Sequence, residues 1–462
     1  MARMRFGAFI PPHHLPTNYN PTYALQRDVE IVQLLDNIGY DEAWFGEHHS
    51  GGVELISDPM MFIAHVAAMT RHIRLGTGVV SLPYHNPLWV ADRLALLDHL
   101  TRGRVMLGLG PGALATDAAM IGLSPHEQRD ALDVDTDVLM HLMTSDEPLS
   151  IETSRYQLVD ARLQLDFYQD PHPEVAAAAV VSPSGPRLAG KHGLGLISIG
   201  ATMKAGVDVL AMHWDVVEQR AKEFGKQARR EAWRVVGLMH LADTKAQALA
   251  DVRHGIREFC DYLQHTAAAP QMQVTGNTLD EYIEWALSTG STVIGTYAEA
   301  IAHIENLIAQ SNGGFGCYLL FDHNWAPFAA KKRHYEIFGN YVVPHFKGTN
   351  RRMQRSEAAL RAVRDPLAAE QLEAIAAFRA RHEAETKNKG CLCRCEFIRT
   401  YRAADRKYLG YFPLPRAAPA RVPGDAPPNT EATVSGFFTC FGFFGSRPAR
   451  DLPLAMFLSS QS

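Results

Sequence analysis

The amino-acid sequence predicts an α/β fold, a (β/α)8 TIM barrel with insertions, followed by a C-terminal helical and disordered extension. Two observations lead to this prediction. Short apolar runs alternate with amphipathic stretches through the first 345 residues, and eight of these runs have the length of a buried strand. Such runs are typical of parallel strands covered on both faces, and eight strand–helix units close a barrel. A doubly wound open sheet shows the same alternation and remains an alternative.

The predicted strands are the apolar runs themselves, most of which end at Gly, Pro or a charged residue. They are Phe6–Ile10, Glu42–Phe45, Ile73–Thr77, Val105–Leu109, Val175–Val181, Leu194–Ile197, Arg234–Met239 and Cys317–Phe321. The predicted helices carry their apolar residues on one stripe. They are Tyr23–Ile38, a helix that begins at Asp58-Pro59, Leu88–Leu100, His126–Met143, Ala205–Phe224, Lys245–His265, Tyr297–Ala309 and Pro327–Val343.

Two insertions and a C-terminal extension complete the predicted organisation. Ser150–Leu165 alternates polar and apolar residues like a strand, and Thr266–Ser291 is a longer insertion of the kind that forms a lid or binding loop in barrels. We expect a barrel over residues 1–348 and a charged helical extension over 349–390. Residues 391–462 hold 8 of the 26 prolines and a clump of phenylalanines without periodicity, so we expect a disordered tail.

Composition narrows the classes of function. The net charge of −5 argues against a nucleic-acid or anionic-membrane partner, which calls for a basic face. No apolar run approaches the roughly 20 residues of a membrane span, and the first residues, MARMRFGAFIPP, contain no apolar stretch typical of a signal peptide. Six cysteines imply no disulfide framework, so we expect a cytoplasmic protein.

Glu47, His48 and His49 are the first candidate site residues. They follow the second predicted strand directly, and active sites of barrels lie at the carboxyl ends of the strands. A histidine there can transfer a proton near neutral pH or bind a cofactor by a hydrogen bond. The alternative is a loop histidine pair without a role. We expect no metal, because no His-x-x-x-His or Cys-x-x-Cys spacing is present.

Glycines mark the ends of the third and fourth predicted strands. Gly78 and Val79 lie in LGTGVVSLP, and Gly110 and Gly112 lie in GRVMLGLGPG. Glycine lets a backbone approach a flat ligand closely, although a tight turn needs glycine as well. The second segment is not the dinucleotide-binding fingerprint, because Pro111 and the residues after it do not open a helix.

The fifth predicted strand ends in a candidate phosphate loop. Ser182, Ser184 and Gly185 precede the helix-like stretch Arg187–Gly193. Small hydroxyls and backbone N–H groups at a helix N-terminus suit a phosphate, and the alternative is a serine that only caps the helix.

Four segments, in this order and spacing across residues 3–348, resemble the luciferase-like flavin monooxygenases. They are FGAFIPP, GYDEAWFGEHH, HIRLGTGVVSLPYHNPLWVADRLALLDHLTRGRVMLGLGPG and VSPSGPRLAGKHGLGL. The resemblance implies a barrel that binds reduced flavin, FMN or FAD, and uses O2 to oxygenate a small apolar substrate, such as the monoterpene limonene. It implies a flavin reductase as partner, which uses NAD(P)H, and it is compatible with a homo-oligomer.

The resemblance also assigns roles to residues. It implies that His48 is catalytic, that Gly78-Val79 is a cis peptide against the flavin ring, and that Ser182, Ser184 and Gly185 hold the phosphate. Gly110 and Pro111 stand where light-emitting members have a cysteine and an arginine, which argues against light emission. Apolar walls of the site are expected from Phe9, Trp44, Tyr84 and Trp285.

Two other functions use the same barrel and stay open at this point. One is a deazaflavin-dependent oxidoreductase that transfers a hydride. The other is a flavin-binding barrel without catalysis, against which the intact His48 and the long insertion argue.

Overall fold

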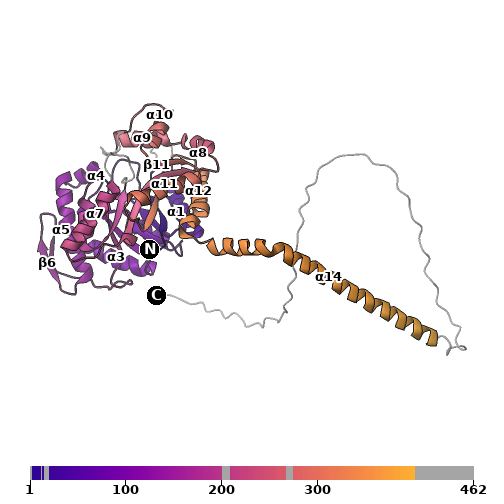
Figure 1. Cartoon of the computed structure of the whole chain (residues 1–462). Helices are drawn as coiled ribbons and strands as arrows, with labels where there is room; N and C mark the ends of the chain where they lie inside the picture. Colours follow the sequence, from indigo (N-terminus) through magenta and orange to yellow (C-terminus); the bar gives the residue numbers. More distant parts are fainter. Residues whose placement is uncertain (1–2, 12, 15–19, 200–208, 267–273, 401–462) are drawn as a thin grey trace, which may run out of the picture. The chain divides into compact units, whose positions relative to one another are not determined.

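The computed structural model describes residues 3–11, 13–14, 20–199, 209–266 and 274–400. The chain divides into two compact units, Met1–Asp365 and Pro366–Ser462. The barrel and the candidate site belong to the first unit (Figure 1).

The described residues form the predicted closed barrel of eight parallel strands. Its strands are β1 (Arg5–Ile10), β2 (Glu42–Phe45), β3 (Arg74–Thr77), β5 (Val105–Gly110), β8 (Val175–Ala179), β9 (Gly195–Ile199), β10 (Trp233–Leu241) and β12 (Cys317–Phe321). The barrel closes because β10 pairs with both β9 and β12: Trp233 lies opposite Leu196 of β9, and Arg234 lies opposite Cys317 of β12. The barrel prediction is therefore confirmed, and the open sheet is excluded.

Helices surround the barrel strands. They are α1 (Pro21–Ile38), α2 (Pro59–Ala67), α3 (Pro87–Thr101), α4 (Ala115–Met120), α5 (Pro125–Thr144), α6 (Ser184–His192), α7 (Val209–Glu223), α8 (Lys245–Val252), α9 (Ile256–His265), α10 (Leu279–Ser288), α11 (Tyr297–Gln310), α12 (Phe328–Ile337) and α13 (Val343–Lys347). Asn20, Asp58 and Asn86 accept backbone N–H groups of the first turns of α1, α2 and α3. Each is followed by a proline, whose missing N–H costs nothing in the first turn of a helix.

Some elements differ from the sequence prediction. The expected helix Lys245–His265 is two helices, because the chain turns at Gly255, where a Cβ would lie 2.0 Å from the Asn324 carbonyl oxygen. The first residues of the expected helix Ala205–Phe224 lie outside the described residues. Short strands β4 (Val80–Ser81) and β11 (Thr292–Gly295) were not predicted, and β11 pairs with the end of β10 beyond the barrel.

The two insertions are structured where they are described. Ser150–Leu165 contains the antiparallel pair β6 (Leu149–Glu152) and β7 (Gln157–Ala161), so its strand-like alternation is confirmed. The insertion Thr266–Ser291 contains α10, and its residues 267–273 lie outside the described residues. Helices α9 and α10 pack against each other around Phe259, Tyr262 and Trp285. We call α9 and α10 the cap helices.

The expected helical extension is present as α14 (Arg351–Thr400), which continues past residue 390, where the prediction ended it. The predicted tail falls mostly on residues 401–462, which lie outside the described residues. No helix that the structure describes combines the length and the apolar character needed to cross a membrane.

Candidate active site

The tripeptide Glu47-His48-His49 lies at the carboxyl end of the barrel, just after β2. Gly46 continues the strand pairing by donating its N–H to the carbonyl of Ile10 at the end of β1 (3.1 Å). The His48 N–H then bonds the carbonyl of Ile56 (3.1 Å). The backbone therefore fixes the tripeptide at the place where barrels carry their chemistry.

His48 is held between two carboxylates. Its Nδ1 lies 3.0 Å from Oδ2 of Asp117 on α4, and its Nε2 lies 3.1 Å from Oε2 of Glu54. The side chains of His48, Glu54 and Asp117 are 13%, 8% and 1% exposed. Two buried carboxylates around one imidazole require a positive charge between them.

The pKa of His48 reflects this arrangement. Burial by itself lowers the pKa, but the charge of Glu54 and the hydrogen bonds to Asp117 and Glu54 outweigh burial and raise the pKa to about 10. Burial raises the pKa values of Glu54 and Asp117, and interaction with His48 lowers both below their usual range. At neutral pH the histidine is therefore an imidazolium and not a free base.

Glu47 organises a second set of contacts. Its Oε1 accepts hydrogen bonds from Nε2 of His49 (2.9 Å) and Nε2 of His85 (2.8 Å), and its Oε2 accepts from the N–H of Ser81 (2.8 Å). Burial would raise the pKa of Glu47, but the hydrogen bonds from His49 and His85 outweigh burial and lower the pKa to about 2. A carboxylate with three donors is an anchor for the loops after β2 and β3, and does not exchange protons near neutral pH.

The cap helices reach this site through Tyr262 of α9. The Tyr262 hydroxyl donates to Oε1 of Glu54 at 2.7 Å, while Oε2 of the same carboxylate faces His48. His13 packs edge-on against the Tyr262 ring at 5.0 Å, and both of its ring nitrogens are buried without a hydrogen-bond partner in the described structure. The insertion is therefore coupled to His48 through a single carboxylate.

The glycine segments form a closely packed floor at the ends of β3 and β5. The Gly78–Val79 peptide bond is cis, as the resemblance implied. A Cβ at Gly78 would lie 2.9 Å from the Phe9 ring, and a Cβ at Gly110 would lie 2.7 Å from Val79. Glycine at these positions lets the ends of β3 and β5 approach closely. The cis peptide therefore packs against Phe9 on one side and Gly110 on the other.

Gly112 has a different role. Its φ of +95° is a left-handed conformation, and a Cβ there would lie 2.1 Å from the Tyr84 hydroxyl oxygen. Gln128 donates to that oxygen at 2.8 Å and to the Pro111 carbonyl at 3.0 Å. These contacts hold the loop after β5 against Tyr84, so Gly112 shapes the loop.

Ser182 precedes α6 and Ser184 is its first residue, so the helix begins three residues earlier than the predicted stretch Arg187–Gly193. Their hydroxyl oxygens lie 2.9 Å apart, and the Ser184 N–H donates to the Ser182 hydroxyl at 3.1 Å. A Cβ at Gly185 would lie 2.2 Å from the Ala178 carbonyl oxygen of β8, so the first turn of α6 rests directly on the strand. Hydroxyls and free N–H groups at a helix start favour an anion.

Of the residues expected to form apolar walls, Phe9 and Tyr84 lie at the site, whereas Trp44 and Trp285 lie in hydrophobic clusters. Phe9 stacks on Phe321 at 5.8 Å inside the carboxyl end of the barrel. Trp44 is fully buried, its Nε1 donates to Glu42 at 2.9 Å and Arg234 covers its ring at 4.7 Å, so it is a core residue. Tyr84 borders the site near His49, with ring centroids 6.1 Å apart, and Trp285 packs among the cap helices.

Sequence reasoning missed Glu54, Asp117, His85 and Tyr262. Each is an ordinary polar residue in a loop or helix, and Asp117 and Tyr262 are 69 and 208 positions away from the residues that they bond. No local pattern marks them. A search for acidic residues that follow other strands would have found Asp117.

Comparison with known proteins identifies the family. The model of the luciferase-like monooxygenase family matches residues 4–310. The chain belongs to this family. As a luciferase-like monooxygenase it is a flavin-dependent enzyme, in agreement with the sequence prediction.

Two curated relatives are similar over most of the barrel. Limonene 1,2-monooxygenase of Rhodococcus erythropolis is 43% identical over 350 residues, which are 75% of this chain and 87% of that protein. The 4-hydroxyprotoasukamycin monooxygenase of Streptomyces nodosus subsp. asukaensis is 39% identical over 351 residues, which are 76% of this chain and 94% of that protein. The two names describe different substrates. Sequence similarity to these two luciferase-like monooxygenases therefore does not specify the substrate of this enzyme.

A solved structure supports the fold of the luciferase-like monooxygenase. The oxygenating constituent of 3,6-diketocamphane monooxygenase from Pseudomonas putida, in complex with FMN, superposes with a TM-score of 0.62 at 22% identity. The match covers 74% of this chain and 98% of that protein.

Proposed function

We propose that this enzyme binds reduced FMN at the carboxyl ends of β2, β3, β5 and β8, and uses O2 to oxygenate a small apolar alkene of monoterpene size. The observation that carries the proposal is the His48 imidazolium, held between Glu54 and Asp117. Glu47 of the same tripeptide bonds Ser81, two residues after the cis peptide Gly78–Val79. The charged His48 group and the glycine floor therefore lie on adjoining loops.

The residues present fit a phosphorylated flavin. Gly78 and Gly110 carry no side chain, and a Cβ at either position would collide with Phe9 or Val79, so the backbone of this floor is available to a planar ring. The Ser182 and Ser184 hydroxyls and the Gly185 N–H at the start of α6 are the donors for a phosphate, since the Ser184 N–H is bonded to Ser182 and Pro186 has no N–H. When bound, reduced flavin with O2 supplies the oxygen atom and the electrons of the reaction.

His48 acts as a proton donor in this proposal. Its two ring nitrogens face carboxylates and its pKa is raised, so it does not remove a proton from a substrate at neutral pH. The two carboxylates outweigh its positive charge, so His48 does not act as an isolated cation. Release of its contact with Glu54 lets His48 deliver a proton.

The substrate proposal follows from the walls and from the relatives. Phe9 and Phe321 present stacked rings at the carboxyl end of the barrel, and such a wall excludes water from an oxidation that water would divert. The relative named limonene 1,2-monooxygenase makes a monoterpene the first substrate to test. A separate flavin reductase that uses NAD(P)H is the proposed source of reduced flavin, since the diketocamphane neighbour is named an oxygenating constituent.

The proposal is tested by anaerobic titration of the protein with reduced FMN, followed by addition of ¹⁸O₂ and limonene or other monoterpenes. We expect stoichiometric binding of reduced FMN and one labelled oxygen atom in the product. Product without the label, or no binding of reduced FMN, contradicts the proposal. Substrate oxidation with a bound deazaflavin in the absence of O2 would favour hydride transfer instead.

The phosphate loop has a separate test. Riboflavin, which lacks the phosphate, should bind at least ten times more weakly than FMN, and Ser182→Asp with Ser184→Asp should remove that difference. Ser356→Asp, on the exposed start of α14, adds a negative charge elsewhere and is the matched control. Equal binding of riboflavin and FMN to the wild-type protein contradicts this site.

A further inference from the structure

A cavity lies at the opposite end of the barrel from His48. It has a volume of about 570 Å³ and is lined by residues that precede β1 and β12 and by the start of α14. Active sites of barrels lie at the carboxyl ends of the strands, so this cavity at the amino ends is separate from the site proposed for the flavin. Its volume is in the range of small-molecule sites.

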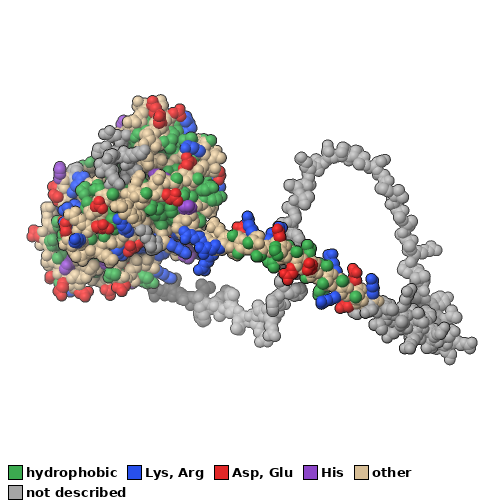
Figure 2. Space-filling view, in the orientation of Figure 1, with side chains coloured by type: hydrophobic (Ala, Val, Ile, Leu, Met, Phe, Trp, Pro, Cys, Tyr) green, Lys and Arg blue, Asp and Glu red, His purple; other side chains and the backbone are tan. Residues whose placement is uncertain are grey.

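One side of this cavity is strongly cationic. Its lining includes Arg3, Lys347, Arg351, Arg352 and Arg355, and it includes no carboxylate. Lys347 is neutralised by Asp41, whose Oδ2 lies 2.6 Å from its Nζ. The four arginines form no ion pair with any residue that the structure describes. Figure 2 shows Lys and Arg side chains gathered where α14 begins.

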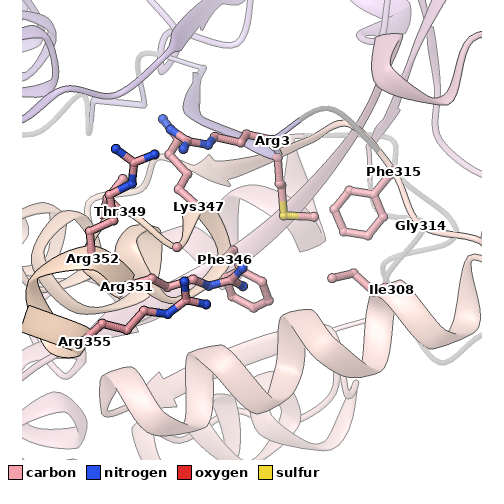
Figure 3. A pocket seen from close by; sticks show the side chains of 12 residues that line it. Arg3, Ile308, Gly314, Phe315, Phe346, Lys347, Thr349, Arg351, Arg352 and Arg355 are labelled. Carbon is pink, nitrogen blue, oxygen red and sulfur yellow. The ribbon is translucent and has the colours of Figure 1, made fainter. Parts of the chain in front are cut away.

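The other side is apolar. Phe315, Phe346, Ile308 and Met4 line it, and Phe315 is buried. In Figure 3 the Phe315 ring and Ile308 lie at one end of the pocket, and the guanidinium groups of Arg352 and Arg355 lie at the other, with Phe346 between them. The cavity therefore pairs an aromatic end with an anion-binding end.

We propose that this cavity binds a nucleotide, with its phosphates on the arginines and its base against Phe315 and Phe346. Guanidinium groups bind phosphate oxygens through paired hydrogen bonds, and several unpaired arginines favour a ligand with more than one negative charge. Inorganic phosphate alone leaves most of the volume and the aromatic end unused. The C-terminal segment 391–462 is a poor occupant, because it carries nine Lys or Arg against five Asp or Glu.

The test is calorimetric titration of the full-length protein with ATP, adenosine and pyrophosphate. ATP should bind at least ten times more tightly than adenosine, and its affinity should fall as salt is raised. Arg351→Ala with Arg355→Ala should weaken ATP at least tenfold. Arg361→Ala with Arg364→Ala removes two charges from the same helix outside the cavity and should leave ATP binding unchanged.

The aromatic end has its own variant. Phe346→Leu should weaken ATP severalfold and leave pyrophosphate unchanged. The proposal is overturned if ATP does not bind, if the two double arginine variants lose ATP affinity equally, or if ATP and adenosine bind with equal affinity. Equal affinity for ATP and pyrophosphate would show that the cavity binds a simple anion instead of a nucleotide. Self-association of the wild-type protein that is lost in the variant Arg351→Ala with Arg355→Ala would show that the cavity binds a second copy of the chain.

Discussion

Replacement of His48 by Gln tests the central feature of the site. The variant keeps a side chain of similar length with an amide donor, and it removes the positive charge between Glu54 and Asp117. A contact of unit charges near 3 Å is worth roughly 5 kcal/mol at an effective dielectric constant of 20, but burial of the partners offsets part of this. Because loss of one partner from a buried pair typically costs about 3–5 kcal/mol, we expect the free energy of unfolding to fall by about 3 kcal/mol at pH 6.

The pH dependence follows from the pKa shifts. The pKa of His48 is raised to about 10 in the folded protein from its ordinary value near 6.5. Its stabilisation is therefore complete below about pH 6.5 and is lost as the pH rises toward 10, at up to about 1.4 kcal/mol per pH unit. The pKa values of Glu54 and Asp117 are lowered, so their contributions are lost as the pH falls below about 4. The wild-type and His48→Gln proteins should differ most between pH 5 and 6.

The assay is urea unfolding at pH 6, 8 and 9.5, followed by tryptophan fluorescence, together with oxygenation of a monoterpene in the presence of reduced FMN. The activity of the variant should fall by about 10²–10⁴, the usual contribution of a proton-transferring or charged catalytic group. His49→Gln is the matched control, since His49 is 31% exposed and bonds only Glu47 through its ring. A stability difference that stays constant from pH 6 to 9.5 would refute the charged state of His48, and wild-type turnover would refute its role.

Three further predictions concern other parts of the enzyme. Tyr262→Phe should raise the pKa of His48 and shift the pH profile of kcat, because the Glu54 carboxylate loses a hydrogen-bond donor and keeps more of its negative charge toward the imidazolium. Tyr282→Phe on the second cap helix should leave the pH profile unchanged, and identical profiles for the two variants would show that the cap does not act on His48. Gly185→Ala should weaken FMN binding more than riboflavin binding, because its Cβ would meet the strand β8 carbonyl at 2.2 Å; calorimetry with both flavins checks this. Truncation after Gly390 should leave activity and the melting temperature nearly unchanged and reduce aggregation, and a loss of activity would show that the tail is a working part.

The sequence by itself determined the barrel and the position of its site. Strands that are buried on both faces appear in the sequence as continuous apolar runs, and an Asn or Asp before Pro marks the start of a helix. Both signals lie within a few neighbouring residues. Once a barrel strand is predicted, the residues that follow it are predicted to lie at the carboxyl end of the barrel. This reasoning placed His48, Gly78 and Ser182 there.

Only the tertiary structure decided what these residues can do. His48 read alone is a histidine that titrates near neutral pH, yet Glu54 and Asp117 raise its pKa to about 10. The structure likewise joined the cap to the site through Tyr262 and gathered Arg3 with Arg355 around one cavity. The physical reason is that charge interactions depend on distance in space and on burial, and barrel closure sets both for residues that lie far apart in the chain.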